Sequence, residues 1–80
     1  MKERVGAVIA AYPETSTILL LGYGELDEIK FGDPKIILDN GDIVYGSQCW
    51  WGSEERIKVW VSAFDNVRNV RVGDYFASST

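Results

Sequence analysis

Two adjacent tryptophans, Trp50 and Trp51, are the residues of this 80-residue chain best suited to binding chemistry. Tryptophan offers a large rigid aromatic surface and one N–H donor, which suits it to stacking on a planar ligand or to closing a subunit interface. Consecutive residues of a β-strand point to opposite faces of the sheet. The sequence therefore predicts that one indole lies in the core while the other faces a ligand or a partner, and it leaves open which is which.

The sequence contains few of the residue types that catalysis and metal binding usually require. The chain has no histidine, which removes the commonest general base, and Cys49 is its single cysteine. A zinc site would need histidines or more thiols, and a disulfide would need a second cysteine. The sequence DNGD at residues 39–42 lacks the alternating oxygen ligands of a calcium loop and is typical of a hairpin turn. We therefore expect a protein that is not an enzyme, with no metal and no cofactor, in which Cys49 is a buried inert thiol.

Arginines gathered in the C-terminal part are suited to holding an anionic ligand, because arginine grips phosphate with two parallel hydrogen bonds. Tyr23 is flanked by two glycines, which in a strand allow a ligand or another backbone to approach closely. A solvated helix face for the arginines and tight packing at the glycines are the structural alternatives. The predicted ligand-binding residues are Tyr23, Trp50, Trp51, Arg56, Arg68 and Arg71.

Composition narrows the class of protein. The net charge of −4 argues against general binding to a nucleic-acid backbone, and an apolar content of 46% indicates a folded domain. The apolar run at residues 18–21, like every other apolar run of the chain, is too short to cross a bilayer, and the first residues show no signal-peptide pattern. We expect a single domain over residues 1–80 that acts in a reducing cytoplasm, with no membrane partner and no direct nucleic-acid partner.

The first half of the chain is expected to form two hairpins. Apolar runs predict strands over residues 5–12 and 17–24, with Ala11 opposite Ile18, Ile9 opposite Leu20 and a polar loop at 25–33. In the second hairpin, Asn40-Gly41 is the strongest turn signal and predicts a two-residue type I′ turn. That turn pairs residue 38 with 43, residue 37 with 44 and residue 36 with 45.

A helix and a last strand are expected to follow. Ser53 is a suitable N-cap, and two glutamates occupy the first turn after it. Ile57, Trp60, Val61 and Phe64 then form one helical stripe, although the run IKVWV at residues 57–61 is also compatible with a strand. Residues 67–72 are expected to form the last strand, with the valines at 70 and 72 inward and the arginine at 71 outward.

These elements predict an α+β fold, a single antiparallel sheet of about five strands with one helix, in the order ββββαβ. One helix covers about one face of a sheet, yet the predicted strands are apolar on both faces, whereas the open face of an antiparallel sheet is usually polar. An uncovered apolar face marks an interface. We therefore expect a homo-oligomer that buries the sheet face left open by the helix.

The stretches LLGYGELDE (residues 20–28) and PKIILDNGDIVYGSQCWWGSEE (residues 34–55) resemble a group of short, uncharacterised bacteriophage-encoded proteins. Those proteins share an early LLGYG strand and a later pattern, PKI.LDNG…WWG.EE, of a hairpin followed by a helix. The chain departs from the pattern at Tyr45, where the group favours tryptophan, and at Ser47, where it favours cysteine. The resemblance implies a viral accessory protein that acts in the cytoplasm of a bacterial host, and it assigns no activity.

Three functions are compatible with these observations. The leading hypothesis is a non-catalytic anti-defence protein, a homo-oligomer that sequesters a nucleotide-type immune signalling molecule in pockets between its subunits. The second is an inhibitor that binds a protein of a bacterial defence complex, in the manner of an anti-CRISPR protein. The third is a structural or assembly component of the phage.

Overall fold

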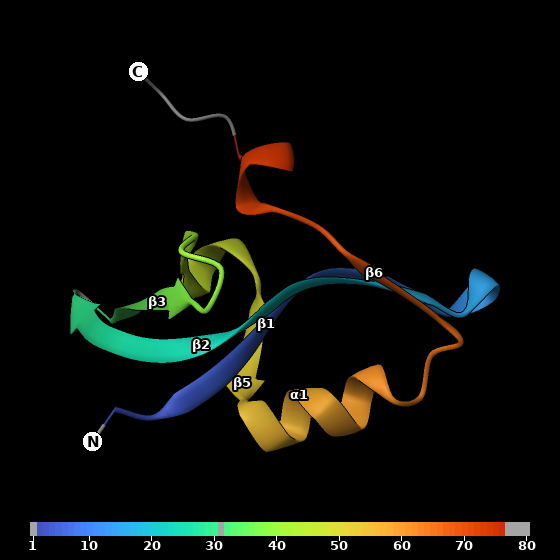
Figure 1. Ribbon diagram of the computed structural model, residues 1–80, viewed down its shortest axis with the longest axis horizontal. Helices are drawn as coiled ribbons and strands as arrows, with labels where there is room; N and C mark the ends of the chain where they lie inside the picture. The colour runs from blue at the N-terminus through green and yellow to red at the C-terminus, as the bar shows by residue number, and fades with distance from the viewer. Residues whose placement is uncertain (1, 31, 77–80) are drawn as a thin grey trace.

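Six strands and one helix make up the part of the chain that the structure, a computed structural model, describes: residues 2–30 and 32–76. The elements are β1 (Arg4–Tyr12), β2 (Thr17–Lys30), β3 (Asp33–Leu38), β4 (Ile43–Tyr45), β5 (Trp50–Ser53), α1 (Glu54–Val61) and β6 (Asn66–Asn69). The sheet has the order β4-β3-β2-β1-β5, and β6 lies beside β2 outside this path (Figure 1). The predicted α+β class, a small and mostly antiparallel sheet with one helix, is confirmed. No described helix is long and apolar enough to cross a membrane.

Strand β2 is the central strand and is 14 residues long. It pairs with β1 along most of its length, with β6 over Thr17–Leu20 and with β3 over Gly24–Lys30. The polar loop expected at residues 25–33 is therefore wrong, because most of that segment continues β2 or begins β3. Leu26 alone in this half of β2 packs against the apolar core. One partly buried apolar position among acidic ones is too weak a pattern to indicate a strand from sequence.

The hairpin between β1 and β2 has Ala11 opposite Ile18, as predicted. Closer to the middle of the sheet, however, the partner of Leu20 is Val8 and not Ile9. Register shifts on both sides of Val8 cause the difference. Such bulges bend and twist a strand pair, and β1 and β2 are visibly curved in Figure 1.

The hairpin between β3 and β4 turns through three residues rather than two. Leu38 accepts a hydrogen bond from the N–H of Gly41 (2.9 Å) and donates one to the carbonyl of Asp42 (2.8 Å). A type I′ turn needs positive φ at both central residues, but only Gly41, at φ 92°, has it, and Asn40 does not. Asn40 instead uses its side-chain oxygen to accept from the N–H of Asp42 at 2.9 Å. The predicted type I′ turn is therefore wrong, and the loop has the turn-plus-glycine form of three-residue hairpins.

This longer loop shifts the predicted pairing by one residue. Ile37 lies opposite Ile43, and Ile36 lies opposite Val44. A one-residue shift moves every side chain of a strand to the other face. Val44 is therefore buried together with Ile36, whereas Ile43 and Tyr45 are exposed.

Two apolar cores lie on opposite sides of the β1–β2 hairpin. The core beneath α1 contains Val8, Ile18, Leu20 and Ile57. The other core contains Val5, Ala7, Leu21, Ile36, Leu38 and Val44, and it is covered by Cys49, Val70, Val72 and Phe76. In Figure 1 the helix lies on one side of β1 and β2, and the β3–β4 hairpin and the C-terminal residues lie on the other.

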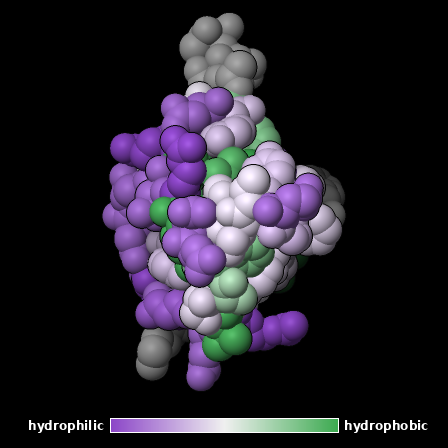
Figure 2. Space-filling view, turned by 90° about the vertical axis from the view of Figure 1, so that its right-hand side faces the viewer, coloured by the Kyte–Doolittle hydropathy of each residue, from purple (hydrophilic) through white to green (hydrophobic). Residues whose placement is uncertain are grey.

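The second apolar face is thus covered within one chain. The sheet curls so that β3 and β4 fold over β1 and β2, and the C-terminal residues close the remaining side. The expectation of an apolar sheet face left open by the helix is therefore wrong, whereas the homo-oligomer itself stays a prediction. At the end of the molecule with the turn between β1 and β2, hydrophilic residues gather on one side and paler, mixed residues on the other (Figure 2).

The helix begins where the sequence predicts, but it ends at Val61, before Phe64. Ser53 caps α1 by accepting a hydrogen bond from the N–H of Arg56 at 3.2 Å, and the predicted stripe packs on the core beneath α1. The strand alternative for residues 57–61 is therefore wrong. Strand β6 is shorter than predicted and runs parallel to β2. Its continuation has Val70 and Val72 partly buried and Arg71 exposed, as predicted.

Candidate ligand cleft

Three of the predicted ligand residues, Trp50, Trp51 and Arg56, meet in one cleft between β5 and α1. The cleft has a volume of about 270 Å³, and its other lining residues are Gly52, Ile57 and Trp60. Because α1 begins directly after β5, the strand and the first two turns of the helix form its two walls. The residues that line the cleft therefore include three tryptophans and one arginine.

The two adjacent tryptophans point to opposite faces of the sheet, as expected. Trp50 lies opposite Val8 of the core beneath α1, and Trp51 lies opposite Ala7 of the other core. Directly opposed residues of an antiparallel pair share a face. Neither indole is buried, however: Trp50 is 68% exposed and Trp51 is 39% exposed. The prediction that one of them is a core residue is wrong, because β5 is an edge strand of the sheet.

The indole of Trp51 is held from the side remote from α1. A Cβ atom placed on Gly46 would lie 2.7 Å from Trp51 Nε1 and 2.6 Å from Pro34 Cγ. Only glycine at position 46 therefore leaves room for both rings. Trp50 is the more exposed of the two, at 68%, so Trp50 is the indole available to a ligand.

The helix supplies a fixed wall. Ile57 is buried beneath the cleft, and Trp60 packs edge-on against Phe64 with ring centroids 6.3 Å apart. Sequence reasoning assigned Trp60 to the core stripe alone and missed its place in the cleft. The signal was present, since Arg56 and Trp60 are four residues apart, and such residues are neighbours on one helix face.

Arg56 is the cation of the cleft. Its side chain is exposed and makes no ion pair with any residue that the structure describes. The other cation of α1 is engaged, because Lys58 lies 3.8 Å from Glu54 and 5.5 Å from the centre of the Tyr23 ring. An anionic group entering the cleft would therefore meet an uncompensated guanidinium.

The remaining predicted residues lie outside this cleft. Tyr23 packs beside Ile57 under the helix, where burial, and then the charge of Glu54, raises its pKa. Arg71 is held by Asp42 through two hydrogen bonds of 2.8 Å, from Nε and Nη2. Arg68 lies on exposed β6. The predicted set of six is therefore not one site, because closeness along the chain placed the arginines together but the fold separates them.

Metal binding and thiol chemistry can be judged from the described residues. Within residues 2–30 and 32–76, no three or more acidic, cysteine or histidine side chains gather as a metal site would require. Burial, and then the charge of Asp33, raises the pKa of the Cys49 thiol to about 11. Cys49 is therefore protonated at neutral pH, and a thiol is a poor nucleophile compared with a thiolate.

The chain matches no protein-family model, no curated protein and no solved structure. Its function is therefore argued from the chemistry of the cleft.

Proposed function

We propose that the protein is a non-catalytic binding protein that holds a nucleotide-type ligand in the cleft between β5 and α1. The observation that carries this proposal is the exposed Arg56, without an ion-pair partner among the described residues, beside Trp50 and Trp60. A heteroaromatic base stacks on an indole with roughly 1–3 kcal/mol per base. A guanidinium binds phosphate oxygens through two parallel hydrogen bonds. The base of a nucleotide would thus stack on an indole of the cleft, and its phosphate would bind the guanidinium of Arg56.

The resemblance to short bacteriophage proteins supports a narrower proposal. The ligand would be a nucleotide signal of a bacterial defence system, and the protein would lower its concentration by stoichiometric binding in the cytoplasm of the host. Such a role needs affinity and abundance but no turnover. It agrees with the thiol form of Cys49 at neutral pH.

We also propose that the cleft is completed by a second copy of the chain. The cleft volume of about 270 Å³ is below the roughly 300–1,000 Å³ of typical small-molecule pockets, so a nucleotide would protrude from it. Strand β5 has a free edge beside the exposed Trp50, and free edges are places where another chain pairs.

The oligomer is tested by light scattering at micromolar concentration, without and with ADP-ribose. We expect a mass of at least two chains under both conditions. A monomer under both conditions would refute the oligomer while leaving binding to one copy testable.

The cleft itself is tested by Gly52→Val. A Cβ at Gly52 would lie 3.8 Å from Ile57, an ordinary contact, and this glycine has no positive φ. Valine should therefore fold normally while its methyl groups occupy the cleft floor. We expect calorimetry with AMP, ADP-ribose and cyclic nucleotides to show binding of at least one of them to the parent, and a loss of about tenfold or more in the variant.

The matched control is Gly73→Val, because a Cβ at Gly73 meets no atom within 4 Å and the site is remote from α1. It should bind as the parent does. Arg56→Gln should remove the preference for a phosphate-bearing ligand over the corresponding nucleoside. Absence of heat with every nucleotide would rule out the proposed ligand class.

An inhibitor that binds a protein is the second candidate, and one surface favours it. Ile37, Ile43 and Tyr45 are exposed on the outer face of β3 and β4, with Ile37 directly opposite Ile43. Glu25 of β2 flanks this row, since it pairs with Ile37. An apolar row beside a carboxylate fits a protein surface with an apolar centre and a basic rim.

A further inference from the structure

A second cavity lies where β2 changes its hydrogen-bonding partner. Strand β6 pairs with β2 as far as Leu20, and β3 begins to pair with it at Gly24. The residues between these two points line a cavity of about 320 Å³. Its other walls are the β3–β4 loop and the start of the C-terminal segment, so elements far apart in sequence meet around it.

The floor of this cavity is apolar and its depth depends on a glycine. Leu21, Leu38 and Val70 contribute apolar side chains. Gly22 has φ 135°, and a Cβ placed on it would meet no atom within 4 Å. The space above Gly22 is therefore open, and a flat ring has room to lie against the backbone.

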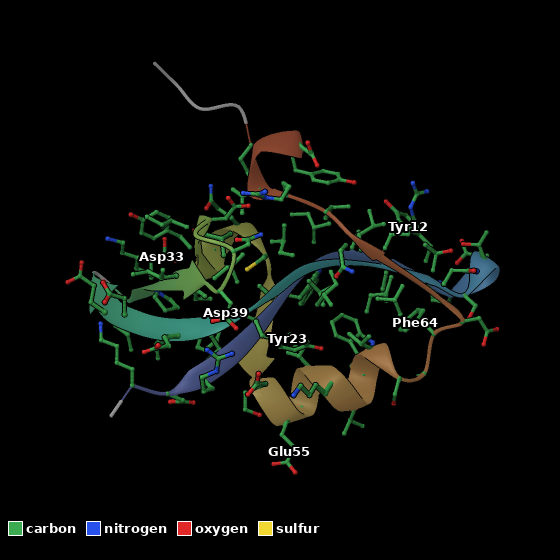
Figure 3. All side chains as sticks on the ribbon, in the orientation of Figure 1. Tyr12, Tyr23, Asp33, Asp39, Glu55 and Phe64 are labelled. Atoms are coloured by element: carbon green, nitrogen blue, oxygen red, sulfur yellow. The ribbon has the colours of Figure 1, made fainter. Side chains whose placement is uncertain are left out.

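Ion pairs within the chain neutralise the charges on the rim. Arg71 gives two hydrogen bonds of 2.8 Å to Asp42, which also accepts from the N–H of Val72 at 3.2 Å. Asp39 accepts from Arg4 at 2.8 and 2.6 Å. The first pair joins the β3–β4 loop to the C-terminal segment. Asp39 lies close to Tyr23 (Figure 3), and its N–H donates a hydrogen bond to the carbonyl of Tyr23 at 2.8 Å.

One polar side chain on the rim retains hydrogen-bonding capacity. The Asn69 amide forms no hydrogen bond with the residues that the structure describes. An amide offers a donor and an acceptor side by side. The matching ligand edge also carries a donor beside an acceptor, as in heterocyclic bases.

We propose that this cavity binds an uncharged heterocycle of nucleoside type, at a site separate from the cleft between β5 and α1. The apolar floor takes the ring, and Asn69 pairs with its polar edge. A phosphate would enter beside the carboxylates of Asp39 and Asp42 and would find no cation free of a carboxylate partner among the lining residues. The cavity therefore discriminates against the phosphate that the cleft with Arg56 prefers.

The test is a titration of the isotope-labelled protein with adenosine and with AMP, followed by NMR. We expect adenosine to shift the backbone amide of Gly22 and the side-chain amide of Asn69. We expect the shifts of these two signals to report about tenfold weaker binding for AMP than for adenosine. We expect the signals of Arg56 to shift more with AMP than with adenosine. No shift at Gly22 and Asn69 with adenosine would overturn the inference, whatever happens at Arg56.

Two variants test the location of the site, and a third tests the hydrogen bonds of Asn69. Val70→Phe fills the cavity and should abolish the adenosine shifts, whereas Val67→Phe, at an exposed position of β6 outside the lining, should leave them unchanged. Asn69→Leu, also at an exposed position, should weaken the binding of adenosine about three- to tenfold, because the hydrogen bonds of the amide are lost. Parent-like adenosine binding in Asn69→Leu would contradict the assigned pairing even if Val70→Phe fails to fold.

Discussion

Replacing Trp50 with alanine is expected to weaken nucleotide binding by about ten- to a hundredfold while the protein remains folded. The indole is 68% exposed and lines the cleft on the face covered by α1. Replacing this indole therefore removes little buried surface, but it removes the most exposed aromatic ring on which a base could stack. Calorimetry with the nucleotide that the parent binds best measures the loss, and a urea titration followed by circular dichroism verifies the fold.

Trp51→Ala is the matched comparison, and the structure predicts the opposite balance. Trp51 is 39% exposed, and its ring nitrogen lies beside Gly46. Its truncation should cost part of the roughly 3–5 kcal/mol that a fully buried tryptophan contributes, with a smaller effect on binding. A Trp50→Ala protein that binds as tightly as the parent would refute the proposed cleft, and equal binding losses in both variants would refute the assignment of Trp50 as the stacking residue.

Local signals sufficed for the helix because its determinants lie within a few residues of one another. The cap by Ser53 and the stripe from Ile57 to Phe64 are both properties of adjacent turns. The β3–β4 turn was misjudged although Asn40-Gly41 is a strong signal. Its form depends on a hydrogen bond that the N–H of Asp42 donates to the side-chain oxygen of Asn40. This bond allows Asn40 to avoid positive φ and so lengthens the loop by one residue.

The candidate site was only half predictable for a related reason. Trp50, Trp51 and Arg56 lie within seven consecutive residues, and the turn from β5 into α1 brings them together. The role of Arg71 depends instead on Asp42, 29 residues earlier in the chain. Nothing local indicates that this arginine is already neutralised.

The two-sided apolar pattern of the strands had two structural solutions, and sequence alone does not distinguish them. One is a flat sheet with a second copy on its open face, and the other is a sheet that curls over itself. The structure adopts the second, since Ile36, Leu38 and Val44 pack on Val5 and Ala7 of the same chain. The bulges in the β1–β2 pairing supply the curvature, and bulges are weakly marked in a sequence rich in alanine and leucine.

The largest loss of stability is expected for Gly24→Ala, at the end of the LLGYG stretch. A Cβ at Gly24 would lie 2.1 Å from the carbonyl oxygen of Ile37 and 2.6 Å from the Cα of Leu38. Both atoms belong to the backbone of β3, which cannot rotate away as a flexible side chain would. The two strands must therefore separate where Gly24 pairs with Leu38, and buried Leu38 must move with them. We expect a loss of about 3 kcal/mol or more, a large part of the stability of a small domain.

Urea unfolding followed by circular dichroism measures this loss, with two other glycines as controls. Gly73→Ala should be close to neutral, because its Cβ would meet no atom within 4 Å and its φ is not positive. Gly22→Ala has open space but φ 135°, so it should cost only backbone strain, about 1–3 kcal/mol. If Gly24→Ala proves as stable as Gly73→Ala, the close approach of β2 and β3 is wrong. If the expected order is found, Gly24 serves strand packing, and Gly22 is the glycine of this stretch that leaves space for a ligand.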